Sequence, residues 1–88
     1  MAKIRRLQSF LRDYSRLPSE IQIRVDKQLE LLLKNSSHPS LRLKKLKGTD
    51  KYEIRVSRGY RLTFRFYERV LELRRIGTHD LLKKEGLP

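Results

Sequence analysis

Two runs of alternating apolar and polar residues constrain this chain most. Every second residue is apolar in residues 51–56, and the same holds for residues 62–66. A period of two is typical of strands with one buried face. Residues 41–47 and 70–76 predict two further strands. The sequence therefore predicts an antiparallel sheet with an apolar underside and, above it, a strip of arginines formed by Arg55, Arg61 and Arg65.

Three short turns connect the predicted strands. Gly48 lies in the first turn and Gly59 in the second, and glycine supplies the positive φ that such turns often need. Glu68-Arg69 forms the third turn. After the last strand, residues 78–82 predict a short turn or helical cap, and residues 83–88 a frayed tail.

Apolar residues at three- and four-residue spacing predict two helices before the sheet. The first stripe runs over residues 7–14 and the second over residues 21–33, with Leu17-Pro18 between them. Proline suits the first turn of a helix, so it begins the second one. Residues 2–6 are compatible with an edge strand or with the start of a helix. We assign Phe10, Phe64 and Phe66 to a core between this helical hairpin and the sheet.

The length of 88 residues corresponds to one domain, residues 1–88. The predicted fold class is α+β, with the helical hairpin packed on one face of a small, mostly antiparallel sheet of four or five strands. The chain has no cysteine, which excludes disulfides and thiolate metal sites. It also lacks a long apolar run and a signal peptide, so we expect a cytoplasmic protein.

The net charge of +12 indicates a polyanionic partner. Most of the excess lies in residues 36–88, which carry fourteen Lys and Arg against six Asp and Glu. The alternative is that the charge only keeps a small protein in solution.

Several short motifs, in this order and spacing, resemble the RelE/ParE superfamily of toxins from toxin–antitoxin systems. They are Leu17-Pro18, Leu46-Lys47-Gly48, Tyr52-Glu53-Ile54-Arg55-Val56, Gly59-Tyr60-Arg61-Leu62 and Ile76-Gly77-Thr78-His79. The resemblance covers nearly the whole chain. It implies two helices on one face of a twisted sheet, a concave basic opposite face, and an acidic antitoxin that neutralises the toxin.

The superfamily has branches with different activities. RelE-like toxins cleave mRNA in the ribosomal decoding site, and ParE-like toxins inhibit DNA gyrase. Arg61 matches the arginine that RelE-like toxins place against the scissile phosphate, and Arg55 falls where that branch has a catalytic lysine. Glu53 reverses a basic position, and the late tyrosine is absent. The Gly77-Thr78-His79 closure is similar to that of YafQ-like ribonucleases, which use a histidine there.

RNA cleavage by its own 2′-hydroxyl requires a base, a stabiliser of the phosphorane charge and an acid for the leaving 5′ oxygen. Arginine suits the second task because its planar fork holds two phosphate oxygens. Arg61 is the first candidate, followed by Arg55. His79 is the candidate acid or base because imidazole titrates near neutral pH. Asp80 is a candidate to orient His79 or to act as base, and the alternative is that both residues only cap the last turn.

Other basic residues are candidates for gripping phosphates without taking part in catalysis. They are Arg42, Lys44, Lys45, Lys47, Arg58 and Arg65, with a solvated face as the alternative. Tyr52 and Tyr60 are predicted to lie in the core rather than to stack on bases. His38 is predicted to be a solvated loop residue.

The sequence therefore predicts a toxin that acts as an endoribonuclease on ribosome-bound mRNA, without a metal or another cofactor. The predicted partners are mRNA, the ribosome and an acidic antitoxin, with no membrane. The main alternative is a non-enzymatic gyrase inhibitor of the ParE kind. A third possibility is a non-toxic module that binds RNA or an antitoxin.

Overall fold

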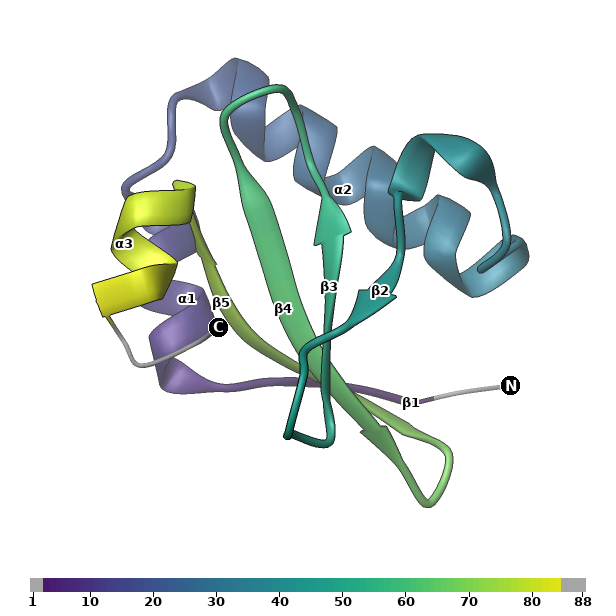
Figure 1. The fold of residues 1–88 in the computed structure, drawn as a ribbon. Coiled ribbons are helices and arrows are strands. Elements are labelled where there is room, and N and C mark those ends of the chain that lie inside the picture. The colour runs from purple at the N-terminus through teal and green to yellow at the C-terminus, as the bar shows by residue number, and fades with distance from the viewer. Residues whose placement is uncertain (1–2, 85–88) are drawn as a thin grey trace.

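A five-stranded mixed sheet forms the centre of the molecule (Figure 1). The computed structural model describes residues 3–84, except for the side chains of Leu81 and Lys84. The strand order is β1-β5-β4-β3-β2. The strands are β1 (Lys3–Arg6), β2 (Lys44–Lys45), β3 (Lys51–Arg55), β4 (Arg61–Tyr67) and β5 (Val70–Gly77). Strand β1 runs parallel to β5, and the other pairs are antiparallel.

Two helices precede most of the sheet in sequence, as predicted. Helix α1 spans Gln8–Ser15 and α2 spans Ser19–Lys34, with Pro18 at the N-cap of α2. Helix α2 runs behind β3 and β4 in Figure 1, whereas α1 packs against β5. A short 3₁₀ helix, η1 (Pro39–Leu41), leads into β2, and α3 (His79–Lys84) follows β5 and contacts it.

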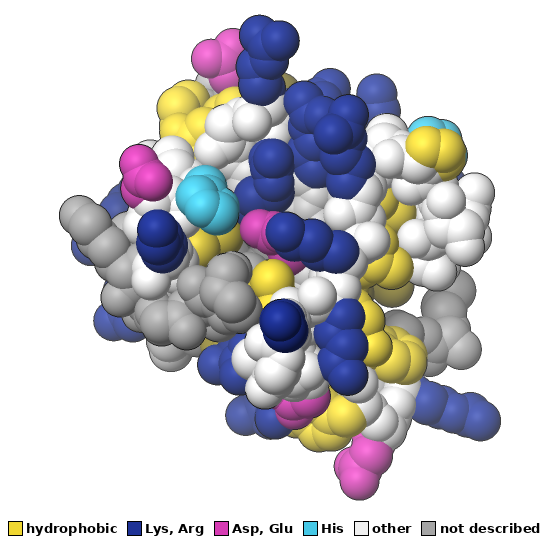
Figure 2. Space-filling view, in the orientation of Figure 1, with side chains coloured by type: hydrophobic (Ala, Val, Ile, Leu, Met, Phe, Trp, Pro, Cys, Tyr) yellow, Lys and Arg dark blue, Asp and Glu magenta, His cyan; other side chains and the backbone are white. Residues whose placement is uncertain are grey.

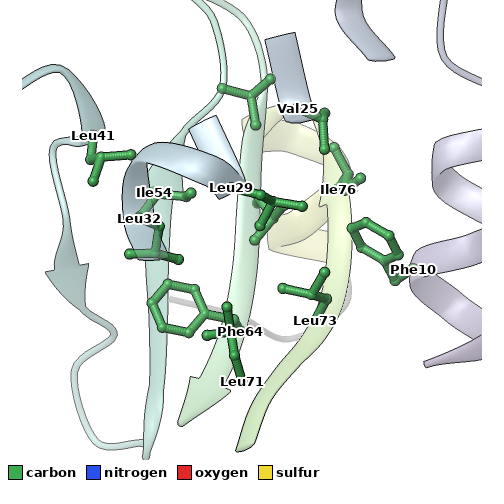
Figure 3. Packing of buried hydrophobic residues seen from close by; sticks show 12 residues of the cluster. Phe10, Val25, Leu29, Leu32, Leu41, Ile54, Phe64, Leu71, Leu73 and Ile76 are labelled. Carbon is green, nitrogen blue, oxygen red and sulfur yellow. The ribbon is translucent and has the colours of Figure 1, made fainter. Parts of the chain in front are cut away.

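The hairpin and the underside of the sheet share one hydrophobic core (Figure 3). Phe10 comes from α1, and Val25 and Leu29 come from α2. They meet alternating side chains of β3, β4 and β5, of which Ile54 and Leu73 are fully buried. Tyr52 and Tyr60 are half-buried against this core, which confirms their predicted placement.

Asp13 connects α1 to β5 with three hydrogen bonds. Its carboxylate accepts from Arg75 Nε at 2.7 Å and Nη2 at 3.2 Å, and from the Ile76 backbone N–H at 2.9 Å. The Asp13 side chain is 9% exposed and that of Arg75 21% exposed. Because both charges are largely removed from water, this ion pair fixes the position of α1 on the sheet edge.

The first predicted strand is wrong over most of its length. Residues 41–47 contain only the two-residue strand β2, because Leu41 ends η1 and Arg42 adopts a left-handed conformation with φ of 47°. The Leu41 side chain is fully buried, so η1 serves to place it in the core. An extended chain would have left it at the sheet edge.

The turns differ from the prediction in which residues carry positive φ. Gly48 does, with φ of 77°, but Gly59 does not. The Ser57–Tyr60 turn closes through reciprocal backbone hydrogen bonds of 3.3 Å. In the β4–β5 turn Glu68 and Arg69 have φ of 48° and 64°, as in a type I′ hairpin.

Phe66 was assigned to the core, but its side chain is 52% exposed. It does face the underside of the sheet, where it lines a groove of about 350 Å³ with Leu33 and Leu43. Phe66 borders this open groove instead of the closed core, so its side chain remains in contact with water. The predicted face is right, and the predicted burial is wrong.

The chain ends differ from the prediction in detail. Lys3–Arg6 forms the edge strand β1, which settles the choice left open for residues 2–6, although Ala2 lies outside the described residues. Residues 79–84 form α3, so Lys83 and Lys84 belong to a helix, and the rest of the predicted tail lies outside the described part. Among residues 3–84 no helix is long and apolar enough to cross a membrane.

Candidate functional site

Arg55 and Arg61 face each other across β3 and β4. Their Cα atoms are register partners, one pair beyond the core pair Ile54 and Leu62. Because side chains alternate along a strand, the two arginines point away from the core-facing side chains of Ile54 and Leu62. Both are half-buried. The structure therefore brings together the two arginines that the sequence selected for phosphate chemistry.

Other guanidinium groups surround this pair. Partial burial lowers the pKa of Arg55, and four neighbouring positive charges lower it further. These are Arg42, Arg61, Arg58 and Arg24. We call these five residues, Arg24, Arg42, Arg55, Arg58 and Arg61, the arginine cluster. Arginine remains protonated at neutral pH despite such a shift, so the cluster concentrates positive charge at one end of the sheet.

No carboxylate neutralises the arginine cluster within residues 3–84. The ion pairs of the described chain involve other basic residues. Arg61 donates from Nη1 to the carbonyl oxygens of Ser57 and Tyr60, at 3.0 and 3.1 Å. These bonds fix the guanidinium above the Ser57–Tyr60 turn while leaving its charge uncompensated. Such a site favours an anion with several oxygen acceptors.

Arg65, the third arginine of the predicted strip, lies in a different environment. Its Nη1 is 3.4 Å from Asp50 and its Nη2 is 3.3 Å from Glu72, and its guanidinium lies 4.4 Å from the centre of the Tyr67 ring. Burial alone would lower the pKa of Arg65, but the charge of Glu72 and the contacts with Tyr67 and Asp50 outweigh it, and the pKa is raised. The charge of Arg65 is therefore neutralised by acidic side chains of the protein itself.

The predicted lysines lie on the exposed edge formed by β2 and the turn after it. Lys44, Lys45 and Lys47 are all exposed. Lys44 Nζ is 3.5 Å from Glu53, whose side chain is only 12% exposed. Lys44 of β2 thus balances the negative charge of Glu53 on the neighbouring strand β3. Figure 2 shows Lys and Arg side chains gathered on this face of the molecule, with a histidine beside them.

His79 and Asp80 begin α3, just after the strand that pairs with Arg61. Gly77, the last residue of β5, is the register partner of Arg61, and His79 follows two residues later. Both side chains are exposed, and Asp80 lies in the first turn of the helix. The two side chains are not hydrogen-bonded to each other in the described residues. The geometry places His79 at the end of the sheet that carries Arg61, with an imidazole open to solvent.

Two basic residues near this site were missed from sequence. Arg24 belongs to the arginine cluster, and Lys27 lies one turn further along the same face of α2. The available signal was their three-residue spacing beside the buried positions Val25 and Gln28. His38 was predicted to be a solvated loop residue, but it is half-buried and caps η1.

The arrangement of strands and helices is similar to that of several solved toxins. YafQ from E. coli superposes with a TM-score of 0.79 at 16% identity, covering 93% of this chain and 98% of that one. The chain has the fold of the RelE/YafQ-type toxins. The YoeB dimer from Staphylococcus aureus gives 0.75 at 17% identity, covering 89% and 97%. A chain of the intact E. coli RelBE toxin–antitoxin complex gives 0.72 at 23%, covering 89% and 96%.

The RelE/YafQ-type fold confirms the predicted fold class. No family model and no curated protein sequence matches the chain. At 16–23% identity the likeness concerns the backbone, so the roles of side chains rest on this chain's own geometry. Within residues 3–84, no group of three or more His, Asp and Glu side chains is placed to hold a metal ion.

Proposed function

We propose that this protein is the toxin of a toxin–antitoxin pair and an endoribonuclease that cleaves mRNA on the ribosome. The observation that carries the proposal is the cross-strand pair of Arg55 and Arg61 inside the arginine cluster, on a RelE/YafQ-type fold. A cluster of uncompensated guanidinium groups at one end of the sheet suits a phosphodiester better than any neutral ligand.

In the proposed reaction the RNA supplies its own nucleophile. The 2′-oxygen attacks the neighbouring phosphorus, and the bond from phosphorus to the 5′ oxygen of the next nucleotide breaks. The products are a 2′,3′-cyclic phosphate and a 5′-hydroxyl, so the proton lost from the 2′-hydroxyl equals the one gained by the leaving oxygen. Arg61 and Arg55 stabilise the additional negative charge on the phosphorane.

His79 is the proposed proton carrier in this reaction. Its imidazole is exposed at the sheet end that holds Arg61, so it is open to an RNA bound there. Imidazole is the side chain that most often serves as general acid or base in enzymes. Asp80 is proposed to orient the imidazole once RNA is bound. Arg42, Arg58, Lys44, Lys45 and Lys47 are proposed to hold the RNA backbone, whereas Arg65 is proposed to act structurally.

An antitoxin is the proposed protein partner. RelBE, which shares the fold, was solved as a toxin–antitoxin complex. The net charge of +12 and the unneutralised arginine cluster favour an acidic antitoxin segment that covers the cluster.

The test is induced expression of the wild type and of Arg61→Ala in a host without the antitoxin, with primer extension on an abundant mRNA. We expect growth arrest and new cuts with the wild type, and a loss of cleavage of about 10²–10³-fold in Arg61→Ala. Arg16→Ala, which removes an exposed arginine at the end of α1, is the matched control and should cut normally.

Other outcomes separate the rival functions. Arrest without cuts, together with loss of DNA supercoiling by purified gyrase, would replace the ribonuclease with a gyrase inhibitor. No arrest at all would leave only a binding module. His79→Gln should lower cleavage by about 10²–10⁴-fold while leaving the protein folded and bound to RNA, whereas a purely capping residue would leave the cleavage rate of the folded protein unchanged.

A further inference from the structure

A basic cleft of about 630 Å³ lies between α2, η1 and the open edge of β3. It exists because β2 is short: Lys44 and Lys45 pair with Glu53 and Tyr52, so β2 leaves the edge of β3 unpaired from Ile54 onward. Gln28 of α2 covers this edge. Its Nε2 donates to the Arg55 carbonyl at 2.9 Å and to the Ser40 carbonyl at 3.4 Å.

Four cationic side chains line this cleft. Arg24 and Lys27 come from α2, Arg42 from the end of η1, and Arg55 from β3. None forms an ion pair with a carboxylate of the described residues. Gln28, which is 6% exposed, supplies a polar and fixed floor. An apolar ligand gains little from such a lining, whereas an anion meets donors on several sides.

Arg42 is held in an unfavourable backbone conformation at the cleft. Its φ of 47° is left-handed, a region that is unfavourable for residues other than glycine. Glycine or asparagine would end η1 with less strain. Strain of this kind is common where a side chain serves a ligand, and here it keeps a guanidinium at the cleft wall.

His38 adds a further donor. Its Nδ1 lies 3.2 Å from the Ser40 backbone nitrogen, which can only donate, so Nδ1 is the acceptor. The proton of the neutral ring is therefore on Nε2. The ring lines the cleft and is half-buried, so the Nε2–H is a neutral donor within a group of cations.

We propose that this cleft binds a backbone phosphate of single-stranded RNA, next to the phosphate held by Arg61. The inference rests on the proposed function and deepens it. Arg55 joins the two sites, because it lines the cleft and is also the cross-strand partner of Arg61. A strand whose scissile phosphate lies at Arg61 therefore has its neighbouring phosphate beside Arg55, Arg24 and Lys27. This second contact fixes the register of the strand before it is cut.

The test compares the double variant Arg24→Ala/Lys27→Ala with Arg12→Ala/Arg16→Ala. Both remove two exposed positive charges, but Arg12 lies on α1 and Arg16 is its C-cap residue, and neither lines the cleft. The probe is a fluorescent 2′-O-methyl RNA, which cannot be cleaved, titrated at several salt concentrations. Circular dichroism confirms that each variant is folded.

Each phosphate contact of a single strand contributes about 0.7 to the slope of log K against log salt concentration. We expect Arg24→Ala/Lys27→Ala to reduce this slope by about 0.7, because the cleft holds one phosphate, and Arg12→Ala/Arg16→Ala to leave it nearly unchanged. Equal slopes for the two variants would overturn the proposal. Loss of binding to a polyglutamate peptide, with RNA binding intact, would overturn it in favour of an acidic protein segment.

The readouts separate this inference from the proposed function. RNA binding with the expected change in slope, but no cleavage by the wild type on ribosomes, would refute only the ribonuclease. Cleavage by the wild type with no specific effect of Arg24→Ala/Lys27→Ala would refute only the cleft. Absence of any RNA binding by the wild type would overturn the cleft directly.

Discussion

The basic side chains of this protein fall into two groups with opposite surroundings. The paired arginines, Arg65, Arg74 and Arg75, contact the carboxylates of Glu72 and Asp13 at 2.7–3.3 Å. The arginine cluster forms no ion pair with a carboxylate of the described residues, and its members are surrounded by other arginines. Both groups lie on or beside the same strands. They differ in their surroundings because the strand register places Glu72, and the packing of α1 places Asp13, beside the paired arginines only.

The comparison shows that the net charge of +12 is not evenly available to a partner. The charge of the paired arginines stabilises the fold, and that of the cluster opposes it through mutual repulsion. A group that lowers stability without a partner is best explained by a ligand that supplies the missing negative charge. The predictions below test whether the two groups differ in this way.

The largest expected effect on stability is at Asp13, the partner of one of the paired arginines. Asp13→Ala removes three hydrogen bonds, two of them from the Arg75 guanidinium, and the ion pair between two side chains that are only 9% and 21% exposed. We expect the free energy of unfolding to fall by about 3 kcal/mol, measured by urea denaturation. This is a large share of the stability of a small domain.

Glu30→Ala is the matched control for Asp13→Ala. It breaks the ion pair between Glu30 and Lys34 on α2, where both side chains are more than half exposed. Exposed pairs at this spacing contribute little to the free energy of unfolding, so Glu30→Ala should change it only slightly. A loss at Asp13 no greater than the loss at Glu30 would contradict the claim that the paired arginines hold the fold together.

A smaller effect of opposite sign is expected in the arginine cluster. Arg58 is exposed in the β3–β4 turn, and its charge acts on Arg55. Arg58→Ala should raise the free energy of unfolding by about 0.5 kcal/mol at low salt, because it removes a repelling charge. The gain should vanish near 1 M salt, where the screening length is about 3 Å.

Arg16→Ala provides the comparison for Arg58→Ala. It removes an exposed arginine that is not in the cluster, so we expect no gain in stability at any salt concentration. If Arg58→Ala instead lowered stability at low salt, a compensating acidic partner would have to exist, and the distinction between the two groups would fail.

The sequence alone predicted correctly those strands and helices in which apolar residues recur at a regular spacing. Alternation over residues 51–56 and 62–66 predicts β3 and β4, and the stripe ending at Leu33 predicts α2, because each pattern is set by the core it faces. Arg42 and Phe66 were misjudged for a different reason. Their positions depend on where η1 bends and where α2 ends, which are tertiary features with no local signal.

The candidate site was predictable only in part. Arg55 and Arg61 could be paired from the short turn between their strands, since a hairpin fixes its own register. The division of the arginine strip could not be foreseen. Arg65 is neutralised by Glu72, its register partner on β5. This pairing depends on a bulge, in which β5 has one extra residue opposite Thr63 and Phe64 of β4. Arg24 reaches the cluster only because α2 packs across the sheet.

The smallest expected effect concerns the acidic residue of α2 that lies closest in sequence to Arg24 and Lys27. Asp26 does not neutralise these residues, because its carboxylate accepts from the Tyr14 hydroxyl at 3.0 and 3.1 Å. Burial raises the pKa of Tyr14, the hydrogen bond and charge of Asp26 raise it further, and Arg6 opposes this weakly. The folded state therefore holds the phenolic proton more tightly than the unfolded state.

A raised pKa in the folded state means that the stabilisation is present below the unfolded value of 10.0 and is lost as the pH rises through the folded value. Tyr14→Phe removes the hydroxyl, so the stability difference from the wild type should be a few tenths of a kcal/mol at pH 8 and should shrink above pH 10. Denaturation at pH 8, 9.5 and 10.5 measures this stability difference.

The variant Tyr14→Phe also frees the Asp26 carboxylate on the helix that carries Arg24. If RNA binding stayed unchanged, Asp26 would be acting between the helices only, and a weaker affinity would mean that Tyr14 normally keeps this negative charge away from the arginine cluster.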